Sequence, residues 1–564
     1  MYGKDITIKI SAALLAACQR FFKDSLPDAA FPEGVDAFFC AAKDPKHGDL
    51  SSNAAMRLAS QARRSPQQIA DAVIPLFKDE LSRAGASEYV RDIEFKGGFI
   101  NVRLADKYYQ GLLLVIKKEA GNYGKNSSGG GKKVNLEYVS ANPTGPLTIA
   151  HGRQAAIGDA LSKLLRFSGY DVTCEYYLND CGRQINMLGL SVEIRYRNLF
   201  GANEPLLEDC YQGEYIIDMA EKVKAEHGDK FISRSGETSA FFRKFAVEAQ
   251  MADINKDLSD FGIKFDVFTS QAGFEARNEV VNTLKELKEK GFIYENEGAE
   301  WFASTRFGDD KDRVVKKSDG SFTYLAPDMA YHRFKYERGY DWLIDLLGPD
   351  HHGYINRMKA AVQALGHDAK SLDILIVQLA TLFRGGEVVR MSTRKAEYIS
   401  LREIMDEIGK DVARYCFLSR RLDSHLDFDI EIAKKESTDN PVYYVQYAHA
   451  RICSIKKFSK KTMLRRILAG TKLELLKTER ERQLMRALSE FPTAVTAAAE
   501  ALEPNKIVVY LNDLARDFHS FYTECRVVTD DAALSKARLF LVECVRIVLA
   551  NGLGLINVTM PEKM

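Results

Sequence analysis

The sequence predicts an α/β protein with a doubly wound parallel sheet, preceded by an N-terminal α+β domain and followed by an all-helical bundle. A strand-loop-helix-strand pattern follows a glycine-rich stretch, and two further short apolar runs flank a helix around residues 342–379. After about residue 400 the pattern is almost wholly helical. A chain of 564 residues is also too long for one hydrophobic core, so three or four domains are expected.

The N-terminal domain is expected to span residues 1–120. It opens with helical spacing of apolar residues and closes with the strand-like run 99–104. Residues 121–132 are rich in Gly, Ser and Asn and are expected to form a flexible linker that buries no core.

The central domain is expected to cover residues 133–398, with an insertion at about 199–270. Its strands and helices are read from apolar periodicity. The strands are expected at 133–140, 171–177, 342–348 and 373–379, and the helices at 152–167 and 353–365. Parallel sheets of this kind bind nucleotides beyond the carboxyl ends of their strands. Residues 399–564 are then expected to form the helical bundle, with an apolar stripe from Leu511 to Tyr522.

Composition excludes few functions. Hydrophobic residues make up 46% and charged residues 28%, no run reaches the ~18 apolar residues of a membrane span, and residues 10–19 lack a convincing signal-peptide cleavage site. Nine scattered cysteines without a CxxC pair indicate reduced thiols. We expect a cytoplasmic protein without zinc. A net charge of +1 is compatible with a nucleic-acid partner, because a local basic surface suffices.

The run Asn135 to Arg153, NLEYVSANPTGPLTIAHGR, resembles the first signature of class I aminoacyl-tRNA synthetases of the arginine branch. The family usually has His-x-Gly-His where this chain has Thr148-Ile149-Ala150-His151. The resemblance implies a Rossmann-type sheet and a helix start that favours phosphate, with His151 and Thr148 catalytic and His151 and Gly152 at ATP. An ordinary strand-to-helix turn is the alternative.

A second run, Arg390-Met391-Ser392-Thr393-Arg394-Lys395, follows a probable hairpin turned by Gly385-Gly386 and resembles the family's Lys-Met-Ser-Lys-Ser. Cations on such a loop can neutralise charge on departing pyrophosphate. The candidates are Arg390, Arg394 and Lys395, and the resemblance adds Ser392 to the catalytic set and Met391 to the ATP contacts. A basic surface loop is the alternative.

Between these runs, Gly348-Pro349-Asp350-His351-His352-Gly353 ends an expected strand. The resemblance gives Asp350 the role of accepting hydrogen bonds from the ATP ribose. The histidine pair could bind metal instead, but no third ligand lies nearby in sequence, so no metal site formed by the protein alone is expected.

An arginine site needs carboxylates and oriented oxygens, because a guanidinium is planar, charged and rich in donors. The strip Tyr324-Leu325-Ala326-Pro327-Asp328 resembles the family's arginine pocket, with Tyr324 and Asp328 facing the guanidinium. Glu137 and Asn142 match positions that hold the amino acid. Solvated helix caps are the alternative reading.

Aromatic and basic residues gather at the start of the helical bundle, from Asn440 to Arg466. Such side chains can stack bases and contact phosphate, although a core with a solvated face is the alternative. The resemblance to the family's anticodon-binding bundle places Tyr447, Arg451, Tyr522 and Met564 at tRNA. It places the run Lys46 to Asn53, and Asn53 in particular, in a module that touches the tRNA elbow.

The resemblance therefore implies an arginine–tRNA ligase whose partners are L-arginine, ATP with Mg²⁺ and tRNA specific for arginine, with no membrane partner. We expect a monomer that forms arginyl-adenylate, transfers arginine to the tRNA 3′ end, and activates arginine only with tRNA bound. Two alternatives stay open. Thr148, Ala150 and the missing first lysine of the second signature would fit a tRNA-binding paralogue without chemistry, and the fold also serves other amino acids.

Overall fold

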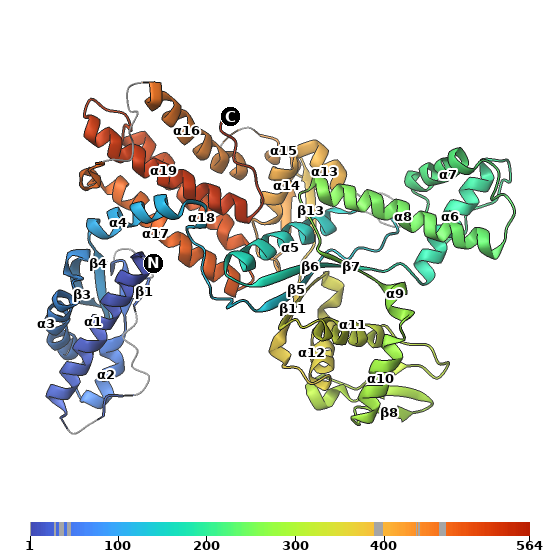
Figure 1. Ribbon diagram of the computed structural model, residues 1–564, viewed down its shortest axis with the longest axis horizontal. Helices are drawn as coiled ribbons and strands as arrows, with labels where there is room; N and C mark the ends of the chain where they lie inside the picture. The colour runs from blue at the N-terminus through green and yellow to red at the C-terminus, as the bar shows by residue number, and fades with distance from the viewer. Residues whose placement is uncertain are drawn as a thin grey trace.

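The computed structural model describes residues 2–27, 30–32, 39–41, 47–388, 399–435, 437, 440–461 and 470–564. The second signature, with Arg390, Met391, Ser392, Arg394 and Lys395, lies outside the described residues, as does Lys46. Figure 1 shows the N-terminal domain and the helical bundle on one side of a central α/β domain, with a helical insertion projecting from the other side.

The central domain contains a five-stranded parallel sheet in the order β12-β11-β5-β6-β7. The strands are β5 (Lys133–Glu137), β6 (Asp171–Leu178), β7 (Val267–Ser270), β11 (Trp342–Leu347) and β12 (Leu372–Ile376). Helix α5 (Ile149–Phe167) covers one face, and α11 (Leu325–Glu337) and α12 (Ile355–Ala364) cover the other. The doubly wound sheet is confirmed, and its two halves diverge between β5 and β11, where such folds bind ligands.

Two additions interrupt the sheet. Helices α6 (Arg183–Asn198), α7 (Glu214–His227) and α8 (Gly236–Asp260) share a small apolar core of their own. Helices α9 (Gln271–Glu275) and α10 (Glu279–Glu289) then lead into an antiparallel sheet of β8 (Ile293–Asn296), β9 (Ala299–Phe302) and β10 (Arg313–Lys316).

The N-terminal domain packs the helices α1, α2 and α3 against the antiparallel sheet β1-β2-β4-β3, and α4 leads from this sheet to the bundle. The elements are α1 (Tyr2–Ser25), β1 (Cys40–Ala41), β2 (Leu50–Ser52), α2 (Ala54–Ala62), α3 (Pro66–Arg83), β3 (Val90–Lys96), β4 (Phe99–Leu104) and α4 (Asp106–Glu119). Within the described residues three ion pairs dock the domain on the bundle, Asp49–Arg486, Asp106–Arg482 and Lys117–Glu543, with N–O distances of 2.7, 2.8 and 3.1 Å.

The expectation of a flexible linker at 121–132 is wrong, because this segment packs. Tyr123 is buried against Phe491, and its hydroxyl donates to the Leu488 carbonyl at 3.0 Å. The amides of Gly129 and Gly131 donate to carbonyls at the end of α5. One aromatic residue and the backbone donors anchor a stretch whose composition alone indicates disorder.

Helices α16 (Pro441–Lys461), α17 (Glu479–Glu500), α18 (Asn505–Glu524) and α19 (Ala532–Leu555) form the bundle. Residues 399–433 pack on the central domain instead, because Arg402 pairs with Asp257 and the buried Arg414 pairs with Asp159 of α5. This segment contains α13 (Leu401–Ile408), α14 (Lys410–Phe417), β15 (Leu426–Asp429) and α15 (Ile430–Ala433). Strand β15, which the sequence did not predict, pairs in parallel with β13 (Ala380–Arg384). No helix within the described residues is long and apolar enough to span a membrane.

Candidate active site

The loop after β5 is strained at the point where the two halves of the sheet diverge. Val139 has φ 66° and Ser140 has φ 37°, and a β-branched residue in this region is rare outside functional sites. The Ser140 hydroxyl donates to Glu137 Oε1 at 3.0 Å and accepts from the Tyr177 amide at 3.0 Å. The loop therefore fixes one oxygen of Glu137.

Three carboxylates stand in a row across the central strands. In strand register, Glu137 of β5 lies opposite Asp345 of β11 and opposite Glu175 of β6. All three are buried, and all three contact side chains of α11 or of the turn that follows it. Adjacent strands are only ~4.8 Å apart, so this row repels itself unless cations lie over it.

Two of those cations, His332 and Lys335, lie on one face of helix α11. The same face carries Asp328 and Tyr331, because the four residues follow helical spacing. The Lys335 side chain is 0% exposed, and its Nζ lies 2.6 Å from Glu137 Oε2 and 2.7 Å from Asp345 Oδ1. Arg338, just past the helix, lies 2.6 Å from Glu175. The resulting acidic cluster contains the carboxylates Glu137, Glu175, Asp328 and Asp345 with the cations Lys335, Arg338 and His332.

His332 is a cation by geometry. Its Nδ1 is 2.8 Å from the Asp328 carbonyl oxygen and its Nε2 is 2.8 Å from the Asp345 carboxylate. Both partners only accept, so both nitrogens must carry protons. Burial lowers the pKa of His332, but Asp345 outweighs burial and the net pKa is raised. Four carboxylates thus face three cations, and the acidic cluster is one positive charge short.

The shortage falls on Asp328 and Glu137. Burial raises the pKa of Asp328 to about 7, and burial raises the pKa of Glu137 with only partial compensation by Lys335. For Glu175 and Asp345, burial also acts to raise the pKa, but the neighbouring cations outweigh it and the pKa is lowered. A ligand that brings one positive charge would therefore be stabilised beside Asp328 and Glu137.

The other expected arginine-site residues surround this position less closely. Asn142 Nδ2 donates to Gln184 at 2.9 Å, and Asp328 accepts from the hydroxyl of Tyr354, a residue that the sequence did not single out. Tyr324, at the N-cap of α11, is 93% exposed, and its side chain makes no hydrogen bond or ring contact within the described part of the chain. The structure thus brings Glu137 and Asp328 to one cluster and leaves the roles of Tyr324 and Asn142 as predictions.

His151 lies in the first turn of α5, with Thr148 as the N-cap residue. The Thr148 amide donates to His151 Nδ1 at 3.1 Å, and the Thr148 hydroxyl lies 3.2 Å from the same nitrogen. A backbone N–H can only donate, so Nδ1 is an acceptor and the proton of the neutral ring is on Nε2. Burial lowers the pKa of His151 to about 4. At neutral pH His151 is thus an uncharged Nε2–H donor.

Asp350 and Gly152, the two other described residues predicted to contact ATP, lie at the same edge of the parallel sheet as His151. Asp350 is exposed in the turn Pro349–Tyr354 that follows β11. Gly152 is buried, and a Cβ there would lie 2.7 Å from the Leu401 side chain. Packing therefore explains this glycine, and its contact with ATP stays a prediction.

Arg153 joins the two signature regions. Its buried guanidinium donates to the carbonyls of Gln378 and Leu379 at 2.7 and 3.2 Å. It also donates to the carbonyls of Arg421 and Ser424, both at 2.9 Å. Strand β13 begins at Ala380 and pairs with β14 (Glu387–Val388), after which the second signature begins. The start of α5 and the base of this hairpin are thus held together.

Sequence reasoning missed Glu175, His332, Lys335, Asp345 and the clamp formed by Arg153. One signal was available for two of them. Asp328, His332 and Lys335 form a polar stripe at helical spacing on a helix that must pack on a sheet.

Family models match most of the chain. "Arginyl tRNA synthetase N terminal domain" matches residues 6–104, "tRNA synthetases class I (R), catalytic domain" matches 113–420, and "DALR anticodon binding domain" matches 445–564. The arginine–tRNA ligase of Citrifermentans bemidjiense is 47% identical over 92% of this chain and 93% of its own length. The chain belongs to the arginyl-tRNA synthetase family.

Further relatives agree. The arginine–tRNA ligase of Listeria monocytogenes serotype 4b is 45% identical to this synthetase over 93% of each chain. A putative arginyl-tRNA synthetase structure from Campylobacter jejuni is 37% identical with a TM-score of 0.75, covering 82% of this synthetase and all of that chain. The Thermus thermophilus arginyl-tRNA synthetase, at 20% identity, shows the fold alone, with a TM-score of 0.74 over 98% of this chain and all of that chain.

In this synthetase an aromatic and basic surface lies between α16 and α18. The Arg451 guanidinium lies 4.8 Å from the Tyr447 ring centroid and 5.0 Å from that of Tyr522, and Nη1 donates to the Tyr522 hydroxyl at 3.2 Å. The rings of Tyr443 and His519 both stack with that of Tyr447. Three expected tRNA residues, Tyr447, Arg451 and Tyr522, thus form one surface.

The other two expected tRNA residues come from elsewhere in the chain. Met564 is exposed, and Pro561 and Glu562 just before it contact His449 and Lys457 of α16. Asn53 is exposed at the N-cap of α2. Asp49, from the same run as Asn53, docks the N-terminal domain on α17 through Arg486.

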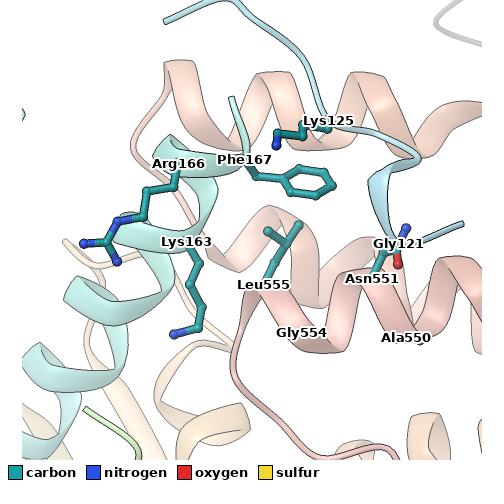
Figure 2. A pocket seen from close by; sticks show the side chains of 9 residues that line it. All are labelled: Gly121, Lys125, Lys163, Arg166, Phe167, Ala550, Asn551, Gly554 and Leu555. Atoms are coloured by element: carbon teal, nitrogen blue, oxygen red, sulfur yellow. The ribbon is translucent and has the colours of Figure 1, made fainter. Parts of the chain in front are cut away.

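One cavity of the synthetase, about 450 Å³, lies where residues 121–125, the end of α5 and α19 meet. Figure 2 shows that its cations point in different directions. Lys163 pairs with Asp159 and Arg166 pairs with Asp266, at 2.7 and 3.0 Å. This cavity lies at the opposite end of α5 from His151 and is not part of the candidate active site.

Proposed function

We propose that this chain ligates arginine to its cognate tRNA in two steps. The arginine carboxylate attacks the α-phosphate of Mg·ATP, forming a P–O bond as the bond to pyrophosphate breaks. A terminal ribose hydroxyl of tRNA then attacks the activated carbonyl and releases AMP. No covalent enzyme nucleophile is needed, so catalysis rests on positioning and charge stabilisation.

The acidic cluster supports this assignment most directly. It is one positive charge short, and the two carboxyls with raised pKa are Asp328 and Glu137. Glu137 ends β5, at the edge where doubly wound sheets bind ligands, and Asp328 lies on α11. A guanidinium supplies one permanent charge and several donors. Asn142 and Tyr324 would complete the site, the latter by closing over the bound side chain.

The proposed ATP contacts come from the start of α5, the turn after β11 and the second signature. Neutral His151 would donate its Nε2–H to the α-phosphate, and Asp350 would accept from the ribose. Gly152 and Met391 would contact ATP, while Ser392 and the cations Arg390, Arg394 and Lys395 would act on the leaving pyrophosphate. A cytoplasmic location and a monomeric state are further predictions from the sequence.

Aminoacylation assays with each of the twenty amino acids test the proposal. We expect charging with arginine alone, and pyrophosphate exchange that depends on added tRNA. Charging with another amino acid would contradict the arginine assignment. Binding of tRNA without any charging would instead identify a paralogue that has lost chemistry.

Replacing Tyr447 by alanine is expected to raise the tRNA KM roughly tenfold or more, because stacking on one aromatic ring stabilises a base by about 1–3 kcal/mol. The KM values for arginine and ATP should not change. Tyr447→Phe, which keeps the ring, is the matched control and should retain the tRNA KM. Equal tRNA KM values for Tyr447→Ala and wild type would mean that this surface does not contact tRNA.

A further inference from the structure

Lys335 bridges two strands of the sheet within the acidic cluster. It is the cation that contacts two carboxylates of the row at once, Glu137 on β5 and Asp345 on β11. These strands belong to the two halves of the sheet, which diverge between them. Lys335 therefore ties together the two sides of the proposed arginine site.

The ammonium contact leaves Glu137 a single orientation. Oε2 accepts from Lys335 at 2.6 Å and Oε1 accepts from Ser140 at 3.0 Å. Both donors are fixed, since Lys335 is fully buried with its Nζ 4.6 Å from the Tyr331 ring centroid and Ser140 lies in the strained loop. Each carboxylate oxygen keeps a second lone pair for a ligand.

Lys335 also fixes the distance between Asp328 and Glu137, the two carboxylates of the proposed arginine site. It lies seven residues after Asp328 on α11, two helical turns along the same face. The distance from Asp328 to Glu137 is therefore set by the helix and by the Lys335–Glu137 contact.

We propose that Lys335 is a positioning residue of the arginine site, which orients Glu137 and sets its distance from Asp328 so that both carboxylates can accept from one guanidinium. Lys335 itself does not touch the substrate. This inference rests on the proposed function.

Two other roles for Lys335 predict different results. A purely electrostatic role would repel the cationic substrate, so removal of the ammonium would lower the arginine KM. A purely structural role would change stability and leave the arginine KM of the folded enzyme unchanged. Positioning alone predicts a higher arginine KM with unchanged ATP binding.

The test compares Lys335→Met with the double variant Lys335→Met/Asp345→Asn in the full-length enzyme. Met keeps the length of the side chain without the charge. The double variant removes one carboxylate charge together with the ammonium, so the acidic cluster keeps its net charge while Glu137 still lacks its charged donor. We expect the arginine KM to rise roughly 10- to 100-fold in both variants, as for loss of hydrogen bonds to charged groups. The KM for ATP and kcat should stay within about threefold.

Arg333→Met is the matched control, since Arg333 is a partly buried cation of the same helix that pairs with Glu286 and Glu337 and does not contact the acidic cluster. Its arginine KM should equal that of wild type. Thermal unfolding of each variant reports the fold separately. If Lys335→Met does not fold, the double variant carries the test, because it buries no additional net charge.

The proposal is overturned by an unchanged or lower arginine KM in folded Lys335→Met, or by recovery of the wild-type KM in the double variant. It is also overturned if neither variant folds, since Lys335 would then serve the fold. Absence of arginine charging by the wild-type enzyme is a different result, which would refute the proposed function itself.

Discussion

Replacing His151 by alanine is expected to slow arginyl-adenylate formation by about 10²-fold or more, as the loss of a preorganised transition-state donor typically does. The Thr148 amide donates a hydrogen bond to His151 Nδ1. Nδ1 therefore carries no proton, and the ring proton on Nε2 is free to be donated to a ligand. Since burial lowers the pKa of His151 to about 4, the neutral donor persists throughout the neutral pH range. Single-turnover adenylate formation with tRNA present is the measurement.

Two further variants give the control. Thr148→Ala removes a hydroxyl 3.2 Å from Nδ1 but keeps the amide that orients the ring, so it should cost less than roughly tenfold. His151→Gln keeps an N–H donor on a side chain of similar reach and should fall between His151→Ala and wild type. If Thr148→Ala proves as slow as His151→Ala, the threonine contributes directly. If neither variant is slow, this helix start does not bind the α-phosphate.

Thr148→His restores the residue that the family usually has at this position. We expect adenylate formation to be retained or accelerated. The new ring has to fit beside Ser400, whose backbone pairs with that of Thr148 in an antiparallel β-bridge. A loss of activity in a folded variant would show that the space of the absent histidine has been filled.

Replacing Asp328 by asparagine is expected to raise the arginine KM roughly 10- to 150-fold, because a charge-assisted contact contributes about 1.5–3 kcal/mol. The KM for ATP should change little. The matched control is Glu337→Gln, the same chemical change on the same helix at a surface ion pair with Arg333. An unchanged arginine KM in Asp328→Asn would move the guanidinium site elsewhere.

Asp328 also predicts how arginine binding depends on pH. Burial raises the pKa of this carboxyl to about 7, so the free enzyme takes up a proton as pH falls through 7. A guanidinium binds the ionised form, so the arginine KM should be near its minimum above pH 8 and rise about tenfold by pH 6. Asp328→Asn should remove this dependence. A wild-type KM that is flat between pH 6 and 8 would contradict the assignment.

The sequence determined the family, the doubly wound sheet and the positions of its signature residues. Apolar periodicity located β5, β6, β11 and the helical bundle, because strand and helix periods are local properties. Composition led to the wrong prediction of a flexible linker at residues 121–132, because the burial of Tyr123 depends on Phe491, in a helix more than 360 residues away in sequence. Strand β15 was missed because its pairing with β13 joins residues 46 positions apart, such as Ala380 and Leu426, and is therefore not a local property of the sequence either.

The tertiary structure decided how the site residues are charged and oriented. Glu137 and Lys335 are 198 positions apart, and the row formed by Glu137, Asp345 and Glu175 exists only through strand register. The tautomer of His151 depends on a ring orientation that four letters of sequence do not specify. A pKa follows from burial and from neighbouring charges, and both are set by packing between distant segments, so the charge state of this site could be read only from the fold.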